Sequence, residues 1–383
     1  MSTAPPMTLR TLETPCLVLE RGRLDRNIAR MRAHTDRLGV ALRPHVKTAK
    51  CHEVTRLALG GRPGGITVST LKEAEQSLAQ GITDILYAVG ITPNKIEHVA
   101  ALRRAGADLT VLVDNLDAAR MLAGRAADLG VEIPALIEID SDGHRAGVHP
   151  DSALILDLGR ALHEGPGTRL RGVMTHAGGS YDCRTTDEIR AMARRERDAV
   201  VRSAARLRAE GLPCPVVSVG STPTATFSED LAGVTEVRAG VYMFFDLVMA
   251  GLGVCEQRDI AVSVLATVLG HQPDKGWIIT DAGWMALSRD RGTAGQRVDQ
   301  GYGVVCDIAG QPIDDMVVVS TNQEHGILGR REGNAVDLSR FPVGATLRIL
   351  PNHACATAAQ HDRYHIVDGG ERIEAIWPRF NGW

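Results

Sequence analysis

The feature that most constrains this chain of 383 residues is a repeated alternation of short apolar runs and helical stretches. It extends from residue 41 to residue 246, and several of the helical stretches end in glycine, as left-handed helix caps do. Most runs are continuously apolar, which is typical of strands buried on both faces of a parallel sheet. The eight runs are Ala41–Lys47, Gly65–Thr70, Asp84–Val89, Leu109–Asp114, Pro134–Asp140, Arg171–His176, Pro215–Ser221 and Glu236–Val241.

Eight successive βα units predict an α/β fold, a closed (β/α)8 barrel with right-handed crossovers. No GxGxxG motif follows the first run, which disfavours an open dinucleotide-binding sheet. From about Ile260 short strands and turns predict a smaller, mostly antiparallel β domain. We expect the barrel over residues 21–255 and the β domain over residues 256–383. An N-terminal segment, residues 1–20, contains the run Pro15–Leu19, which we expect to pair with the β domain.

Composition excludes several classes of protein. The net charge is −3 and aromatic residues make up 4%, so neither a basic field nor a base-stacking surface for nucleic acid is expected. The chain shows no apolar segment of signal-peptide or membrane-spanning length. Its seven cysteines include no CxxC pair, which is typical of a reduced compartment. We therefore expect a cytoplasmic protein with no membrane or nucleic-acid partner.

Lys47 is one of only five lysines and stands at the end of the first run. In barrels of this kind the chemistry lies at the carboxyl ends of the strands. An amine held in a desolvated position there becomes a nucleophile for a carbonyl group. The alternative is an ordinary strand-end lysine whose amine reaches water.

Glycine and hydroxyl residues end the last two runs. Backbone N–H groups at Gly220-Ser221-Thr222 and at Gly240-Val241 would suit a phosphate, although both are also ordinary turn sequences. An imine-forming lysine together with a phosphate site indicates pyridoxal phosphate. His176, which ends the sixth run, would then stack on the cofactor ring, or is otherwise a structural histidine.

The segment His353-Ala354-Cys355 is a candidate metal site. In an extended chain the two side chains point to the same face. Imidazole with thiolate favours zinc, and a site with only two protein ligands leaves positions open, as a catalytic metal requires. A buried structural cysteine is the alternative reading of this short spacing. A rival pair, His361 and His365, would need a helix, whereas the sequence around it indicates an extended chain.

Segments spread over essentially the whole chain resemble the group of D-serine dehydratases and D-threonine aldolases, which are fold-type III pyridoxal-phosphate enzymes. The segments are RPHVKTAKC (43–51), GITVSTLKEAE (65–75), IEIDSDGHRAGV (137–148), THAGGSY (175–181), VSVGSTPT (217–224), EVRAGVYMFFD (236–246), DAGWMALSRDRG (281–292), NQEHG (322–326) and PNHACAT (351–357).

The resemblance implies an alanine-racemase-type barrel with Lys47 as the lysine that binds pyridoxal phosphate. It implies a divalent metal on His353 and Cys355 and a homodimer in which the β domain completes the partner's site. Arg238 is similar to the arginine that meets the pyridine nitrogen in alanine racemases. The remaining implied or candidate cofactor residues are His176, Tyr181, Ser221, Thr222, Gly240, Val241 and Tyr242.

The implied activity is a zinc-assisted dehydration of a D-3-hydroxy amino acid, converting D-threo-3-hydroxyaspartate to oxaloacetate or D-serine to pyruvate. Cys355 favours a dehydratase, because D-threonine aldolases of the group tend to have aspartate there and a harder ion. The alternatives are an aldolase that gives glycine and an aldehyde, an amino-acid racemase, and a non-catalytic cofactor-binding protein. Arg289 or Arg291 is the candidate for a second substrate carboxylate.

Overall fold

The computed structural model describes residues 7–62, 64–333 and 336–383, so residues 1–6 of the expected N-terminal segment lie outside the described residues. The chain divides into two compact units. The first contains the described residues up to Ala29 together with Val241–Asn381, and the second contains Arg30–Gly240 together with Gly382–Trp383. Along the chain, the divisions fall after Ala29 and before Val241, whereas the sequence indicated boundaries after residues 20 and 255.

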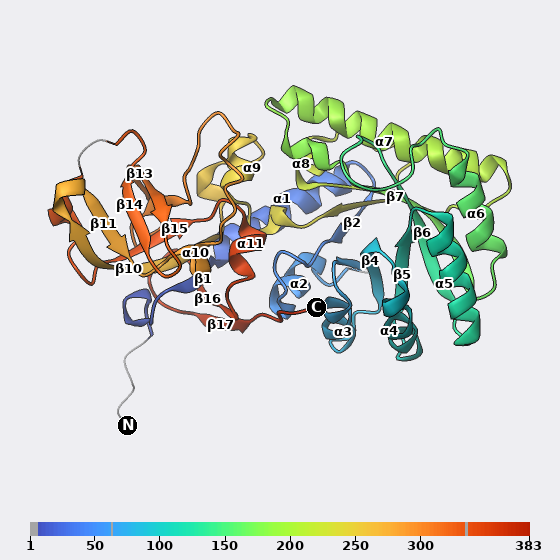
Figure 1. The fold of residues 1–383 in the computed structure, drawn as a ribbon, viewed down its shortest axis with the longest axis horizontal. Helices are drawn as coiled ribbons and strands as arrows, with labels where there is room; N and C mark the ends of the chain where they lie inside the picture. The colour runs from blue at the N-terminus through green and yellow to red at the C-terminus, as the bar shows by residue number, and fades with distance from the viewer. Residues whose placement is uncertain (1–6, 63, 334–335) are drawn as a thin grey trace. The chain divides into compact units, whose positions relative to one another are not determined.

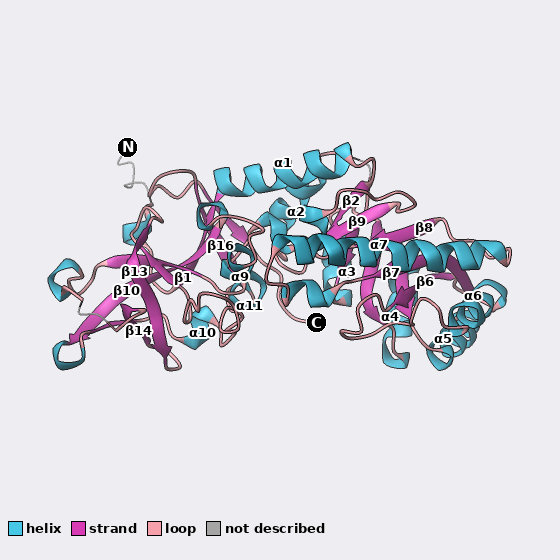
Figure 2. Cartoon of the chain, turned by 90° about the horizontal axis from the view of Figure 1, so that it is seen from above, coloured by secondary structure: helices cyan, strands magenta, loops and turns pink. Residues whose placement is uncertain are grey.

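The second unit contains eight parallel strands in the order β2-β9-β8-β7-β6-β5-β4-β3. A parallel bridge between His45 and Thr67 joins the two ends of this order, so the sheet closes into the predicted barrel (Figures 1 and 2). The strands are β2 (Ala41–Pro44), β3 (Ile66–Val68), β4 (Asp84–Gly90), β5 (Asp108–Val113), β6 (Ile133–Ile139), β7 (Thr168–Thr175), β8 (Val216–Val219) and β9 (Glu236–Ala239).

Helices follow the barrel strands and lie outside them (Figure 1). They are α2 (His52–Leu59), α3 (Leu71–Leu78), α4 (Pro93–Arg104), α5 (Leu116–Asp128), α6 (Leu154–Glu164), α7 (Thr186–Ala209) and α8 (Thr222–Phe227). Helix α1 (Arg21–Arg37) comes before the first barrel strand, and the division between the two units falls within it. Side-chain caps begin several of them: the Thr70 hydroxyl accepts the N–H of Glu73 at 3.1 Å. The glycines predicted to end helices all have positive φ, as expected for that role; they are Gly39, Gly60, Gly81, Gly106, Gly130 and Gly211.

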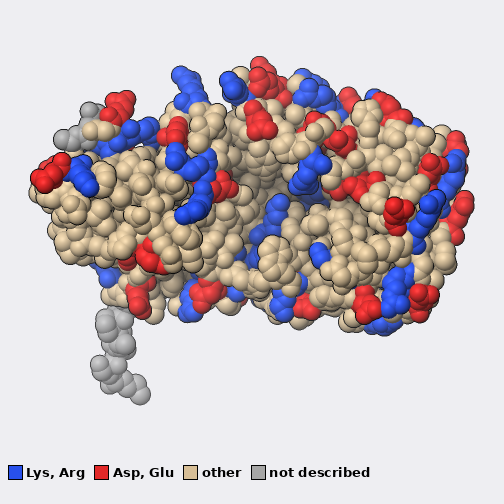
Figure 3. Space-filling view, in the orientation of Figure 1, with Lys and Arg blue, Asp and Glu red and all other residues tan. Residues whose placement is uncertain are grey.

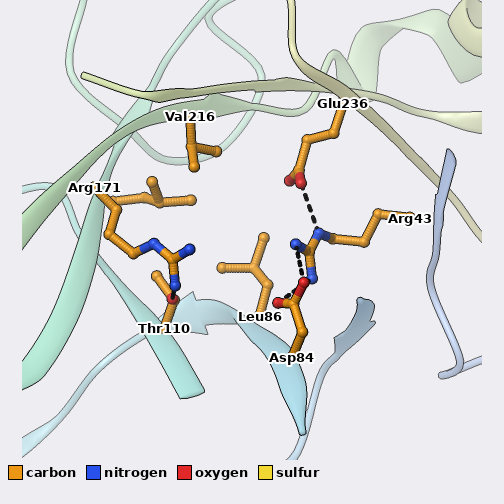
Figure 4. A pocket seen from close by; sticks show the side chains of 8 residues that line it. Arg43, Asp84, Leu86, Thr110, Arg171, Val216 and Glu236 are labelled. Atoms are coloured by element: carbon orange, nitrogen blue, oxygen red, sulfur yellow. Dashed lines mark hydrogen bonds and ion pairs between the residues drawn. The ribbon is translucent and has the colours of Figure 1, made fainter. Parts of the chain in front are cut away.

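The amino-terminal end of the barrel is closed by charged residues below an apolar layer of Leu86, Leu112, Leu136 and Met174. A cavity of about 20 Å³ lies there, with room for about one water molecule, and Figure 4 shows the side chains that line it. Its central group is a guanidinium that pairs with two carboxylates: Arg43 Nε lies 2.7 Å from Glu236 Oε2, and Arg43 Nη1 lies 2.9 Å from Asp84 Oδ1. These ion pairs join β2, β4 and β9 at the end of the barrel away from the expected chemistry.

The first unit is a nine-stranded, mostly antiparallel sheet, as predicted. Its strands are β1 (Cys16–Glu20), β10 (Val262–Gln272), β11 (Trp277–Thr280), β12 (Val304–Cys306), β13 (Pro312–Thr321), β14 (Gly326–Arg330), β15 (Thr346–Leu350), β16 (Arg363–Val367) and β17 (Ala375–Pro378). Short helices α9 (Leu247–Gly251), α10 (Trp284–Leu287) and α11 (Ala354–Ala358) lie between strands. β1 pairs with β10 and β16, which confirms the expected pairing of the N-terminal run.

Acidic and basic side chains are interspersed on the molecular face seen in Figure 3. None of the helices described has the length and apolar character needed to cross a lipid bilayer. All seven cysteines lie in described residues, and none of them forms a disulfide.

Candidate functional site

Lys47 lies in the turn after β2, which ends at Pro44, so the strand is shorter than the predicted run to residue 47. Its side chain is exposed, so the desolvated position suggested for its amine is wrong for this structure, whereas His45 beside it is buried. Burial and then the Lys47 charge lower the pKa of His45 well below its usual value, and the same two effects act on His176. Lys47, His45 and His176 therefore share the carboxyl end of the barrel, where chemistry was expected.

His176 follows β7 and is held by the loop after β8. Its Nδ1 lies 2.8 Å from the carbonyl oxygen of Gly220, so Nδ1 donates and Nε2 is left without the proton. Burial lowers the pKa of His176 to about 3, and the charges of Lys47 and Arg238 contribute. The ring is therefore neutral at pH 7. Tyr181 has its ring centre 6.4 Å from that of His176.

The loop Gly220-Ser221-Thr222 is built from close polar contacts. Ser221 Oγ accepts the N–H of Thr224 at 3.2 Å, which caps α8, and lies 2.8 Å from Ser180 Oγ. Thr222 is buried, and its hydroxyl oxygen has no hydrogen-bond partner among the described residues. Gly220 has φ +144°, and a Cβ there would lie 1.9 Å from the carbonyl oxygen of Arg238. Only glycine fits that approach.

Arg238 is buried on β9 and faces the barrel interior. Its Nε donates to Ser218 Oγ at 2.8 Å, and its Nη2 donates to the carbonyl oxygen of Thr175. Burial lowers the pKa of Arg238, and the carboxylates of Glu236, Glu196 and Glu138 oppose that effect. Hydrogen bonds thus orient the guanidinium, and nearby carboxylates balance its positive charge.

Gly240 directly follows β9 and lies close to another segment of backbone, because a Cβ there would lie 2.9 Å from the carbonyl oxygen of His45. The two residues that follow it in the predicted cofactor set, Val241 and Tyr242, are buried in a short 3-10 helix, η3 (Val241–Met243), of the first unit.

The residues of the second unit fit pyridoxal phosphate. Lys47 supplies an accessible amine, and the loop after β8 supplies a buried hydroxyl, that of Thr222, without a protein partner. A buried hydroxyl in that condition is costly unless a ligand satisfies it. Neutral His176 and the buried Arg238 guanidinium are the ring-facing candidates.

The side chains of His353 and Cys355 interact, but the backbone between them is not extended as predicted. The chain is extended only at His353, which is the residue before helix α11, and Cys355 lies inside that helix. The predicted extended geometry is therefore wrong, although the two side chains share a hydrogen bond. The alanine-rich segment 354–358 favours helix. Asp246 Oδ2 accepts the N–H of Ala354 at 2.9 Å and satisfies one amide at the start of that helix.

Asp290 orients His353. The Asp290 carboxylate lies 2.6 Å from His353 Nδ1, which leaves Nε2 for a metal. Burial lowers the pKa of His353, but the hydrogen bonds with Asp290 and Cys355 outweigh it and raise that pKa to about 11. A divalent cation would replace the proton that this arrangement now holds. The pair therefore fits a metal ion.

No set of three His, Cys, Asp or Glu side chains is arranged to hold a metal within residues 7–62, 64–333 and 336–383. A metal on His353 and Cys355 would thus have two protein ligands from this unit, and water or substrate would have to complete its coordination. The rival residues are occupied elsewhere: His365 is in strand β16, as its extended sequence predicted, and His361 Nε2 lies 3.0 Å from the carbonyl oxygen of Ala286.

Sequence reasoning missed the residues that support the site. Asp290 lies 63 positions from His353 and Asp246 lies 108 positions from Ala354, so no local pattern could pair them. The candidates for a second carboxylate have partners within the first unit: the Arg291 guanidinium lies 2.5 Å from Asp299 Oδ2, and that of Arg289 lies over the Trp284 ring at 4.4 Å.

Comparison with known proteins extends these observations. Residues 19–248 match the family described as alanine racemase, N-terminal domain, and residues 261–367 match the putative serine dehydratase domain. The chain is 55% identical to D-threo-3-hydroxyaspartate dehydratase of Delftia sp. (strain HT23), over 98% of this chain and 99% of that protein. It is 30% identical to D-serine dehydratase of Dictyostelium discoideum, over 95% and 96%. It is 32% identical to D-threonine aldolase of Arthrobacter sp, over 97% and 93%.

The solved structure of D-threo-3-hydroxyaspartate dehydratase from Delftia sp. HT23 superposes with a TM-score of 0.96 at 54% identity, covering 98% of this chain and all of that one. A cysteine-to-alanine mutant of D-threo-3-hydroxyaspartate dehydratase, solved in the metal-free form, gives the same score, identity and coverage.

Fold and site together define an alanine-racemase-like protein, a fold family that uses pyridoxal phosphate, with an additional antiparallel β unit. The chain belongs to the family of D-serine dehydratases and D-threonine aldolases.

Proposed function

We propose that this protein is a pyridoxal-phosphate- and metal-dependent lyase that eliminates water from a D-3-hydroxy amino acid, after which the product tautomerises and is hydrolysed to a 2-oxo acid and ammonia. The first candidate reaction converts D-threo-3-hydroxyaspartate to oxaloacetate, and the second converts D-serine to pyruvate. The observation that carries the proposal is the 55% identity, over nearly the full length of both chains, to a D-threo-3-hydroxyaspartate dehydratase.

Lys47 is the proposed catalytic residue, because its amine is accessible at the carboxyl end of the barrel. It would bind the cofactor and, once freed, take the Cα proton of the substrate as general base. Bound pyridoxal phosphate would supply an electron sink for the negative charge at Cα. His176 would lie against the ring, and Arg238 would face its nitrogen. The other proposed cofactor contacts are Tyr181, Ser221, Thr222, Gly240, Val241 and Tyr242.

His353 and Cys355 are the proposed metal ligands, with Asp290 orienting the imidazole. We propose zinc as the ion, since thiolate with imidazole favours it, although other divalent ions suit a site with two protein ligands. The metal would act as a Lewis acid on the leaving β-hydroxyl. The metal-free structure of a cysteine mutant supports a metal role for a cysteine in that protein, and 54% identity makes Cys355 the candidate here.

The second candidate function is the retro-aldol reaction, favoured by the D-threonine aldolase at 32% identity. In that reaction a base removes the β-hydroxyl proton, the Cα–Cβ bond breaks, and glycine and an aldehyde form. Cys355 argues against it, because the aldolases of the family tend to have aspartate at this position. A racemase or a non-catalytic binding protein would release neither ammonia nor glycine.

Lys47 can be tested by spectroscopy. Lys47→Ala should abolish the visible absorbance of the lysine-bound cofactor, whereas Lys50→Ala should keep it, because Lys50 is paired with Glu73 at 3.4 Å. Absorbance that persists in the Lys47 variant would contradict the assignment. Chelation of the metal should lower turnover without removing the absorbance.

We further propose a cytoplasmic homodimer with no nucleic-acid or membrane partner. Seven cysteines without a disulfide among them suit a reduced compartment. Sedimentation of the purified protein at several concentrations tests the dimer, and a monomer at all of them would contradict it.

A further inference from the structure

Glu196 is a buried carboxylate at the centre of helix α7, and the sequence did not single it out. Its Oε1 accepts two backbone N–H groups, from Ala177 at 2.9 Å and from Gly220 at 3.1 Å. A hydrogen bond with the Thr224 side chain also stabilises the carboxylate, although burial raises the pKa of Glu196 above its usual value. One side chain thus holds the loop after β7, the loop after β8 and helix α8.

These two loops carry several of the proposed cofactor contacts. His176 directly precedes Ala177, and Ser221 and Thr222 directly follow Gly220. The loops are also joined to each other, by His176 Nδ1 to Gly220 O at 2.8 Å and by Ser180 Oγ to Ser221 Oγ at 2.8 Å. Glu196 lies behind them on the helix side, where its acceptor oxygen binds both amides.

The donors in the hydrogen bonds described for Glu196 are neutral groups. Burying a charged carboxylate among them costs more free energy than burying a neutral side chain. Each amide would be left without a partner if the carboxylate were removed. What the arrangement achieves is a fixed distance between the His176 turn and the Thr222 hydroxyl, whose oxygen is buried without a partner among the described residues.

We infer that Glu196 is a positioning residue that sets these two loops for the phosphate group of pyridoxal phosphate. The inference rests on the proposed function, because it assumes that the loop after β8 binds that phosphate. Glu196 itself touches neither cofactor nor substrate. Toward the two loops it acts as a hydrogen-bond acceptor, while its negative charge acts on the buried Arg238 guanidinium.

The test compares the affinity of the cofactor-free full-length protein for pyridoxal phosphate with its affinity for pyridoxal, which lacks the phosphate. In Glu196→Ala the dissociation constant for pyridoxal phosphate should rise by about tenfold or more, because two amides lose their acceptor, while that for pyridoxal changes by less than about threefold. Glu196→Gln retains an acceptor oxygen and should bind both ligands as tightly as the wild-type protein does. Equal losses for both ligands, or no loss for pyridoxal phosphate, would overturn the inference.

Two further variants guard against loss of folding. Glu196→Asp keeps the charge but shortens the side chain, so it should lower the ratio of the two affinities even if the alanine variant does not fold. An unchanged ratio in a folded Glu196→Asp protein would overturn the inference. Glu210→Ala changes an exposed carboxylate at the end of the same helix and should leave both affinities unaltered.

The wild-type titration separates this inference from the proposed function. If the wild-type protein bound pyridoxal phosphate no better than pyridoxal, the proposed phosphate loop would be wrong, and the role of Glu196 would be overturned with it. If the wild type prefers pyridoxal phosphate and Glu196→Ala keeps that preference, only the inference about Glu196 is wrong.

Discussion

Gly220 shows how one backbone position shapes the candidate site. A Cβ there would lie 1.9 Å from the carbonyl oxygen of Arg238, and φ is +144°. Because the obstacle is backbone rather than a flexible side chain, Gly220→Ala should lower the free energy of unfolding by about 3 kcal/mol or more. Gly211→Ala is the matched control: φ is +75°, but no atom lies within 4 Å, so it should cost only about 1 kcal/mol. Similar losses in urea denaturation would contradict the account.

His176 predicts a pH dependence of stability. Its pKa is about 3 in the folded protein, mainly because of burial, against about 6.5 when unfolded. Between these values the unfolded chain binds a proton that the folded protein excludes, so the free energy of unfolding falls as the pH falls from 6.5 towards 3. His176→Gln should reduce that slope by up to about one proton in denaturation measured across this range. An unchanged slope would show that His176 already titrates normally in the folded protein.

At the scale of an element, the loop before α11 depends on residues distant in sequence. Asp290 bonds His353 Nδ1 at 2.6 Å, and Asn352 Nδ2 donates to the carbonyl oxygen of Gly301 at 2.6 Å. Asp290→Asn should lower metal affinity by about 10- to 100-fold, because the imidazole loses its orienting carboxylate. Titration against a chelating dye measures this. Asp274 is exposed, so Asp274→Asn should leave the metal affinity unchanged. Equal metal affinity in both variants would contradict a role for Asp290 in the metal site.

The same element shows where sequence reasoning failed. The position of His353 and Cys355 in a region rich in short strands suggested an extended segment, whereas helix α11 begins at Ala354. The alanines of this segment favour helix, so the sequence does contain a helical signal there. The Asp246 carboxylate that accepts the Ala354 N–H could not have been found, because it comes from a residue far away in the chain.

At the scale of the whole molecule, closure of the barrel depends on charged residues at its amino-terminal end. Arg43 pairs with Asp84 at 2.9 Å and with Glu236 at 2.7 Å, in a mostly buried position. Arg43→Met should lower the free energy of unfolding by about 3–5 kcal/mol, because a buried carboxylate loses its partner. Arg62→Met breaks the exposed pair with Asp36 and should cost less than about 1 kcal/mol. Equal effects in urea denaturation would contradict a structural role for the Arg43 cluster.

The architecture was largely predictable because most of the barrel strands are continuous apolar runs, and the glycines that follow several helices mark their ends. The eight strands, the barrel and the separate, mostly antiparallel sheet of the first unit are all confirmed. Strand β12, which pairs with β13, was not predicted, because a strand of only three residues is too short to leave a clear periodic pattern. The supporting carboxylates Glu196 and Asp290 escaped notice because their partners are backbone amides and a histidine brought near only by folding.

The proposed dehydration of a D-3-hydroxy amino acid can be tested directly by identifying its products. The purified protein, supplied with pyridoxal phosphate and zinc, is incubated separately with D-threo-3-hydroxyaspartate, D-serine and D-threonine, and each tube is assayed for 2-oxo acid, ammonia and glycine. The account predicts oxo acid and ammonia in equal amounts without glycine, fastest with D-threo-3-hydroxyaspartate. Glycine with an aldehyde would contradict it and assign the protein to the aldolases of the family.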